Sequence, residues 1–145
     1  MTMFEIGQRI KVNGEKTKVL GIVEYSSPPE YAIEMDAKKC WLEPFDKMWR
    51  LWKNVSGEGN PVIEAIVNSD MANAIGATYG DFHISSHGIA TATTSIGNTW
   101  RVEVGDSVKL WRGENLANKE WSLFIAERNK DGVMLWVGQY VSVEV

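Results

Sequence analysis

The sequence predicts an all-β protein, an antiparallel barrel or sandwich of short strands with at most one or two short helices. Apolar and polar residues alternate over short stretches of the 145-residue chain, as they do in half-buried strands. Turn-forming residues interrupt the alternation about every 8–12 residues, the strand spacing of sandwiches and barrels. Two turn sequences, Asn13-Gly14 and the run from Asn129 to Gly132, are typical of β-hairpins.

The first third of the chain predicts five strands joined by short turns. Residues 10–12 and 17–25 flank the Asn13-Gly14 turn. Pro28 and Pro29 end the second of these strands, because proline cannot donate a ladder hydrogen bond. The remaining strands are expected over residues 31–35, 40–42 and 48–52.

Residues 61–67 fit either a helix or a strand. Asn60 can cap a helix that has Pro61 in its first position, whereas the β-branched residues that follow favour a strand. Later strands are expected over residues 79–84, 89–94, 100–104, 107–111, 121–128, 133–137 and 140–145.

Charge and tryptophan divide the expected single domain, residues 1–145, into three parts. Residues 54–99 contain four acids and no Lys or Arg, so they carry the whole net charge of -4, while the charges of the two ends, +1 and -1, cancel. All seven tryptophans lie outside this segment. This partition suggests two related β units, residues 1–53 and 100–145, joined by the acidic segment.

The two ends of the chain also resemble each other in order. Residues 5–15 align with residues 103–114 after one insertion, and the apolar alternation is repeated with the glycines. Two interpretations remain open: a duplicated strand-and-turn unit, or a common way of opening a strand. The identical pairs are Glu5/Glu103, Gly7/Gly105, Lys11/Lys109, Gly14/Gly113 and Glu15/Glu114.

Composition excludes several classes of protein. The single cysteine, Cys40, cannot form an intramolecular disulfide, so a reducing, cytoplasmic location is expected. No basic and apolar leader opens the chain, and no apolar run approaches the roughly 18–20 residues that span a bilayer. Nucleic-acid binding is not expected either, because lysines and arginines are interspersed with acids in an acidic chain.

Motifs for metals, nucleophiles and nucleotides are weak or missing. His83 and His87 would lie about 13 Å apart on a strand at ~3.3 Å per residue, too far for one metal ion. Cys40 has lysine neighbours that favour a thiolate but no nearby histidine, so a half-buried strand position is expected. No glycine-rich phosphate loop is found, and no cofactor is expected.

Four carboxylates near the first tryptophans allow two interpretations. They are either part of a solvated face of mixed charge, given the lysines among them, or an acid/base pair of a hydrolase. No catalytic residue is assigned on this basis. The four are Glu34, Asp36, Glu43 and Asp46.

Tryptophans on the strand over residues 48–52 suggest an interaction surface. Successive side chains on a strand point to opposite faces, so Trp49 lies on one face and Arg50 and Trp52 on the other. An exposed tryptophan beside an arginine suits a protein partner, a sugar ring or a lipid headgroup. Packing of both faces in the core is the alternative interpretation.

Short motifs in a fixed order resemble the bacterial DUF4178 domain family. The first half supplies IGQRIKVNG (6–14), VLGIVEY (19–25), WLE (41–43) and WRLW (49–52). The second half supplies GIATA (88–92), Gly97, VGD (104–106), SLFIAE (122–127) and WVGQY (136–140). The resemblance implies a β-rich intracellular domain, sometimes encoded near membrane-stress or membrane-remodelling genes, with no catalytic residue to carry over.

The resulting expectation is a non-enzymatic binding module that acts by protein–protein contact, as an accessory to a membrane-associated or stress-related assembly. Its surface is expected at Trp49, Arg50 and Trp52, and a homo-oligomer is one arrangement left open. A small-ligand or glycan-binding β-barrel is the alternative, and a hydrolase using acidic residues is a third hypothesis.

Overall fold

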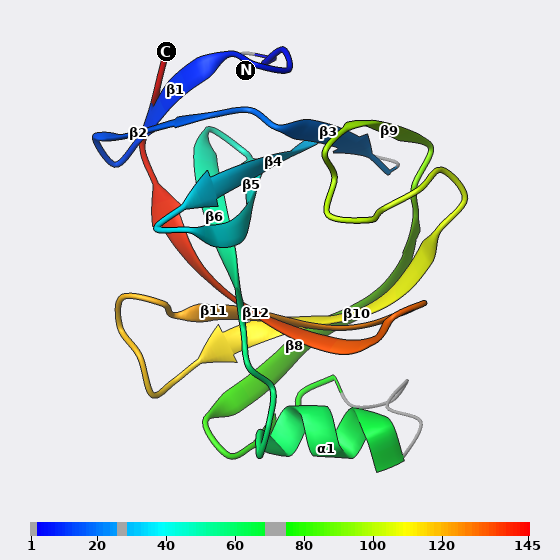
Figure 1. The fold of residues 1–145 in the computed structure, drawn as a ribbon. Helices are drawn as coiled ribbons and strands as arrows, with labels where there is room; N and C mark the ends of the chain where they lie inside the picture. Colours follow the sequence, from blue (N-terminus) through cyan, green and yellow to red (C-terminus); the bar gives the residue numbers. More distant parts are fainter. Residues whose placement is uncertain (1–2, 26–28, 69–74) are drawn as a thin grey trace. The chain divides into compact units, whose positions relative to one another are not determined.

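The computed structural model describes residues 3–25, 29–68 and 75–145. The mainly-β prediction is confirmed, since antiparallel strands and one short helix make up the described part of the chain (Figure 1). Within these ranges the strands form two sheets, and neither closes on itself as a barrel. The helix has eight residues, and none in the described ranges is long and apolar enough to cross a membrane.

The chain divides into two compact units, each assembled from separate segments. The first comprises Met1–Lys53, Thr91–Asp106 and Tyr140–Val145, and the second comprises Asn54–Ala90 and Ser107–Gln139. The acidic segment over residues 54–99 therefore contributes to both units.

The smaller sheet of the first unit contains the predicted Asn13-Gly14 hairpin. It joins β1 (Arg9–Val12) to β2 (Glu15–Lys18), and β13 (Val143–Glu144) pairs with the other edge of β1. Asn13 and Gly14 have φ angles of 49° and 82°, as a type I′ turn requires. Asn13 Oδ1 also accepts a hydrogen bond from the Ser142 backbone N–H at 2.9 Å, which attaches the C-terminal segment to the turn.

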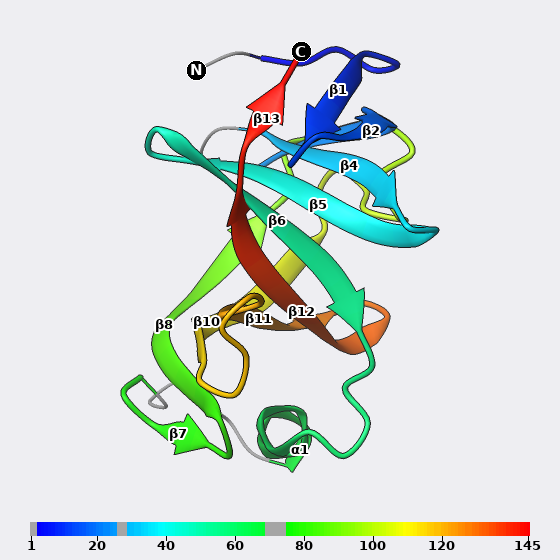
Figure 2. The ribbon, with the colours of Figure 1, turned by 90° about the vertical axis from the view of Figure 1, so that its left-hand side faces the viewer.

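The other strands of the first unit belong to the larger sheet and run in the order β6, β5, β4, β3, β9. Figure 2 shows β6, β5 and β4 side by side. Their apolar sides bury a core that includes Val23, Ile33 and Leu42. Gly21 is required where β3 meets β9, because a Cβ there would lie 2.2 Å from the Asn98 carbonyl oxygen. The strands are β3 (Gly21–Glu24), β4 (Glu30–Met35), β5 (Lys38–Phe45), β6 (Met48–Val55) and β9 (Thr94–Gly97).

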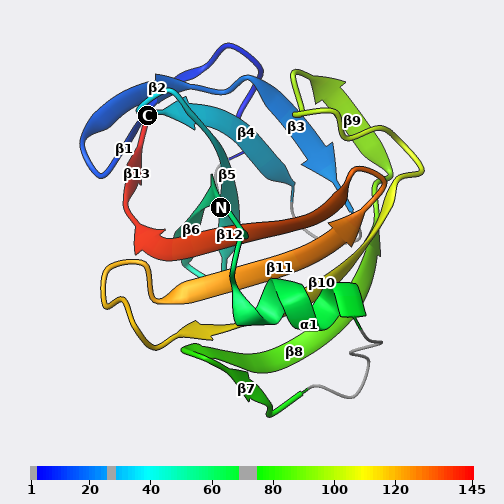
Figure 3. The ribbon, with the colours of Figure 1, turned by 60° about the horizontal axis from the view of Figure 1, so that its bottom comes forward.

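The second unit packs its strands against α1 (Pro61–Asn68), which lies beside β10 and β11 (Figure 3). The strand order is β7, β8, β10, β11, β12. One apolar cluster joins the helix to this sheet; its buried members are Val62, Ile66, Ile84, Trp111, Phe124, Ala126 and Leu135. The strands are β7 (Thr78–Tyr79), β8 (Phe82–Thr91), β10 (Ser107–Asn115), β11 (Leu123–Asn129) and β12 (Gly132–Val141).

The ambiguous residues 61–67 are helical. Asn60 Oδ1 accepts the Val62 backbone N–H at 2.9 Å, so the predicted cap forms, and Pro61 occupies the first position. Val62 and Ile66, four residues apart, are buried on one face of the helix. A strand would have placed the exposed Glu64 on that same face. The packing of this face therefore outweighs the strand propensity of the β-branched residues.

Several expected strands differ from the structure, and the one expected over residues 140–145 is divided between the end of β12 and β13. The strand expected over residues 100–104 does not form, because Trp100 and Arg101 adopt left-handed φ angles of 52° and 74°. Residues 17–25 separate into β2 and β3, and Val19 between them pairs with the turn before β1, its N–H donating to the Gln8 carbonyl at 2.9 Å. The strands expected over 79–84 and 89–94 are largely replaced by one strand, β8. Residues 26–28, including Pro28, lie outside the described residues.

The sequence similarity between residues 5–15 and 103–114 has a structural counterpart in its first part. Gly7 and Gly105 both have positive φ angles, 84° and 93°. In each turn a side chain three residues on accepts from a glutamate N–H: Gln8 from Glu5 at 3.0 Å and Asp106 from Glu103 at 2.8 Å. The equivalence ends there, because β1 turns back at Gly14 whereas β10 continues to Asn115. The shared feature is therefore a turn and a strand opening.

Candidate functional site

The β5–β6 hairpin carries the residues that the sequence singled out. In its register Glu43 lies opposite Arg50 and Trp41 lies opposite Trp52. Opposed residues share a face and alternate residues return to it, so Glu43, Arg50 and Trp52 lie on one face. Trp49 lies on the other, as the sequence predicts.

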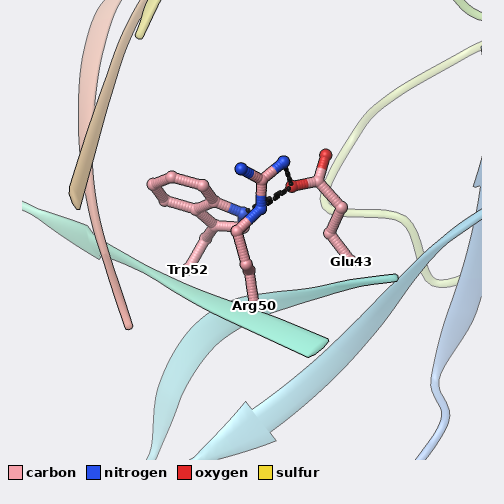
Figure 4. A network of polar contacts seen from close by, with 3 residues as sticks. All are labelled: Glu43, Arg50 and Trp52. Atoms are coloured by element: carbon pink, nitrogen blue, oxygen red, sulfur yellow. Dashed lines mark hydrogen bonds and ion pairs between the residues drawn. The ribbon is translucent and has the colours of Figure 1, made fainter. Parts of the chain in front are cut away.

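The Glu43 network, formed by Glu43, Arg50 and Trp52, centres on a single carboxylate oxygen (Figure 4). Glu43 Oε1 accepts from Arg50 Nη2 at 2.7 Å, from Arg50 Nε at 3.0 Å and from Trp52 Nε1 at 3.1 Å. The Arg50 and Glu43 side chains are only 15% and 12% exposed, and Trp52 is 3% exposed. Charge-assisted bonds of this kind are about twice as strong as neutral ones, so the network fixes the hairpin face.

On the opposite face, Trp49 packs into an aromatic stack. Its ring lies 5.1 Å from the Phe4 ring with an interplanar angle of 16°, and 6.1 Å from the Tyr31 ring. The Tyr31 hydroxyl accepts the Phe4 backbone N–H at 3.2 Å, and burial raises the pKa of Tyr31. Trp49 therefore anchors the N-terminal segment to the sheet.

The exposed apolar surface of this hairpin lies at its tip. The hairpin-tip cluster consists of Phe45, Met48 and Tyr140, which are 45%, 51% and 43% exposed. Phe45 and Met48 are opposed across the strands, and the Phe45 and Tyr140 rings lie 6.5 Å apart. The Arg50 guanidinium carbon lies 3.8 Å from the centre of the Phe45 ring, a cation–π geometry. Side chains two residues apart on a strand share a face, so Phe45 could have been placed on the face of Glu43, and Met48 on that of Arg50, from the sequence.

A second glutamate, in the other unit, also accepts a hydrogen bond from an indole N–H. Glu127 Oε1 accepts from Trp136 Nε1 at 3.1 Å and from Asn129 Nδ2 at 3.1 Å. Burial raises the pKa of Glu127, and the Trp136 and Asn129 hydrogen bonds and the charge of Arg112 oppose that rise. Each tryptophan follows its glutamate by nine residues, a repeated spacing that sequence reasoning missed.

The four acids considered for catalysis are not gathered into a pair. Asp36 and Asp46 lie in the turns at opposite ends of β5, whose eight residues span roughly 25 Å at ~3.3 Å each. Glu34 is exposed on β4, and Glu43 is bound in its network. This arrangement offers no support for an acid/base pair among them.

The histidines and the cysteine have local structural contacts. His83 Nδ1 lies 2.9 Å from Thr78 Oγ1, and the His87 ring lies 5.1 Å from the Trp111 ring. Burial raises the pKa of Cys40 to about 11, which keeps the thiol protonated at neutral pH. In the part of the chain that the structure describes, no three His, Cys, Asp or Glu side chains gather closely enough to hold a metal ion.

Comparisons with protein-family models, with curated proteins and with solved structures find no match to this chain.

Proposed function

We propose that this protein is a non-enzymatic, β-rich binding module that contacts a partner protein through the hairpin-tip cluster. The observation that carries the proposal is the exposure of Phe45, Met48 and Tyr140 side by side at the tip of β5 and β6. Aromatic residues, methionine and arginine are the types enriched where proteins bind one another.

The cluster stands on a rigid support, which lowers the entropy that binding must overcome. The Glu43 network holds one face of the hairpin, and the stack of Trp49 on Phe4 holds the other. Arg50 extends from the network over Phe45, so its charge lies beside the apolar surface. Trp49, Arg50 and Trp52 thus act mainly as the support of the proposed surface.

The cellular setting belongs to the same proposal. The DUF4178 resemblance and the single cysteine support a bacterial cytoplasmic protein that is accessory to a membrane-associated or stress-related assembly. A partner with an apolar pocket would match Phe45, Met48 and Tyr140.

The proposal is tested by placing a photo-crosslinking amino acid at Lys47, in the turn beside the cluster, and identifying proteins crosslinked in cells. We expect the double substitution Phe45→Ser and Met48→Ser to abolish crosslinking to the specific partner, because it removes the apolar contact area. Val104→Ser, which alters a residue at least as exposed in the same unit, should leave crosslinking unchanged. Equal crosslinking by the double variant would contradict the assignment.

A further inference from the structure

The hairpin of β1 and β2 gathers four cations on one face. In its register Arg9 lies opposite Lys18, and Lys11 lies opposite Lys16. Opposed residues share a face and alternate residues return to it, so these four side chains form one cationic face. All four are exposed, whereas the residues that alternate with them on β1 are buried. Burial of the apolar side therefore fixes the direction in which the cationic face points.

The charges of the cationic face are not balanced within the structure. Like charges directly opposite each other on neighbouring strands repel and destabilise the pairing. None of the four forms an ion pair with an acid of the described residues. Glu144, opposite Lys11 on β13, is the acid that the strand register places on this face. Elsewhere the first unit is acidic, since it has ten Lys and Arg residues in total, these four included, against eleven Asp and Glu residues.

The spacing of the four cations follows from strand geometry. Alternate residues lie roughly 6.4–6.8 Å apart along a strand, and opposed residues lie about 4.5–5.5 Å apart across the pair. An extended segment with an acidic residue at every second position repeats its carboxylates at the same distance. Laid along the hairpin, one carboxylate would meet Arg9 and Lys18, and the next would meet Lys11 and Lys16. Each contact replaces repulsion between two cations with charge-assisted hydrogen bonds to an anion.

We propose that the cationic face binds an acidic segment of a partner protein, extended and with carboxylates at alternate positions. A nucleic acid fits this face less well, because no aromatic residue of the three strands lies on it to stack with bases, and the acids elsewhere in the unit repel a phosphate backbone that continues past four cations. A membrane also fits less well, because no apolar side chain of these strands lies on this face to enter it. The face shares no residue with the hairpin-tip cluster, so the proposal goes beyond the proposed function.

Two synthetic peptides of identical composition test the spacing. One alternates glutamate with threonine, and the other has all its glutamates in one block, where successive carboxylates of an extended chain point to opposite sides. In NMR titrations of the full chain at low salt, the alternating peptide should shift the amides of β1 and β2 and bind several-fold more tightly. Added salt should weaken this binding. Equal affinities for the two peptides, or shifts confined to other strands, would overturn the proposal.

Substitutions on the cationic face should change the affinity in opposite directions. Lys11→Gln combined with Lys16→Gln should weaken binding of the alternating peptide about tenfold, because each exposed charge pair contributes up to about fivefold. Glu144→Gln should tighten binding, because it removes the carboxylate that faces Lys11. Lys109→Gln combined with Lys119→Gln is the control: it changes the net charge equally at exposed residues of the second unit and should leave binding unchanged. Equal losses in the two double variants would contradict the assignment.

Three further measurements complete the test. In urea, the variant carrying Lys11→Gln and Lys16→Gln should be at least as stable as the wild type, because like charges no longer oppose each other; a less stable variant would show that these lysines stabilise the fold and would overturn the proposal. The variant carrying Phe45→Ser and Met48→Ser should bind the alternating peptide normally, and loss of binding there would also count against it. Preferential binding to vesicles of equal parts phosphatidylcholine and phosphatidylserine, or to duplex DNA, would assign the face to a different anion and overturn the proposal.

Discussion

Two glutamates of this protein are each bound by a tryptophan nine residues further along the chain, yet their electrostatic surroundings differ. Glu43 forms an ion pair with Arg50 at 2.7 Å. Glu127 is bound by the indole of Trp136 and the amide of Asn129, and burial raises its pKa. The raised pKa of Glu127 makes its contribution to stability depend on pH.

The raised pKa of Glu127 predicts a pH dependence of the free energy of unfolding. In the window between the unfolded and folded pKa values, the folded protein binds more protons than the unfolded chain, so stability falls as the pH rises through that window and remains lower above it. Glu127→Gln removes this ionisation and keeps a side-chain oxygen that can accept from Trp136 and Asn129. Urea unfolding should show the variant's stability relative to wild type rising from weakly acidic to neutral pH. A difference that does not change with pH would contradict the assignment.

Backbone strain at Ala37 predicts a stabilising substitution. Asp36 and Ala37, in the turn between β4 and β5, have φ angles of 53° and 59°. A residue with a Cβ costs about 1–2 kcal/mol in this region, and glycine avoids most of that cost while increasing the entropy of the unfolded chain. Ala37→Gly should raise the free energy of unfolding by up to about 1 kcal/mol in urea titrations.

A matched substitution controls for the intrinsic effect of glycine. Ala65 lies inside α1, where its φ angle is already favourable. Ala65→Gly should lower the free energy of unfolding by about 1 kcal/mol. If Ala37→Gly and Ala65→Gly lowered the free energy of unfolding equally, the assignment of backbone strain to Ala37 would be contradicted.

At the scale of elements, hairpins are the parts of this fold most readily predicted from sequence. The Asn13-Gly14 hairpin turns at the expected residues because both accept positive φ angles. The β11–β12 hairpin likewise turns between Asn129 and Gly132. The segment over residues 61–67 could not be assigned in this way, because its cap favoured a helix and its β-branched residues favoured a strand. Burial of Val62 and Ile66 against the sheet decides for the helix.

The stability of the first turn of α1 is expected to depend on the Asn60 cap. Its side chain accepts the Val62 N–H at 2.9 Å, which satisfies one of the unpaired donors of the first turn. Asn60→Ala should lower the free energy of unfolding by about 1 kcal/mol and speed amide exchange in the first turn of α1. Asn60→Asp, which keeps the acceptor, is the control and should retain most of the stability. Unchanged exchange in Asn60→Ala would rule out the cap as a stabilising contact.

At the scale of the whole molecule, sequence order and spatial grouping differ. Charge and tryptophan separate residues 54–99 from the two ends, whereas each compact unit combines distant segments of the chain. Residues 91–106 and 140–145 join residues 1–53 in the first unit. Such grouping depends on long-range strand pairing, for instance β1 with β13 and β3 with β9, which a local pattern does not encode.

The candidate site was predictable only in part, for the same reason. Alternation along residues 48–52 correctly separates Trp49 from Arg50 and Trp52. It does not show which face is covered, because that depends on Phe4 and Tyr31 on one side and on Glu43 on the other. Tyr140 could not be placed beside Phe45 from sequence, since it lies far along the chain from the hairpin whose tip it joins.

The sequence by itself determined the mainly-β class, the hairpin turns and the alternation that orients side chains, because these follow from local sterics and from the two-residue period of a strand. Only the tertiary structure decided the helix at residues 61–68, the burial of Trp52 and the grouping of Phe45, Met48 and Tyr140 at an exposed tip. These features depend on which distant surfaces exclude water from a side chain, and burial is a property of the assembled chain.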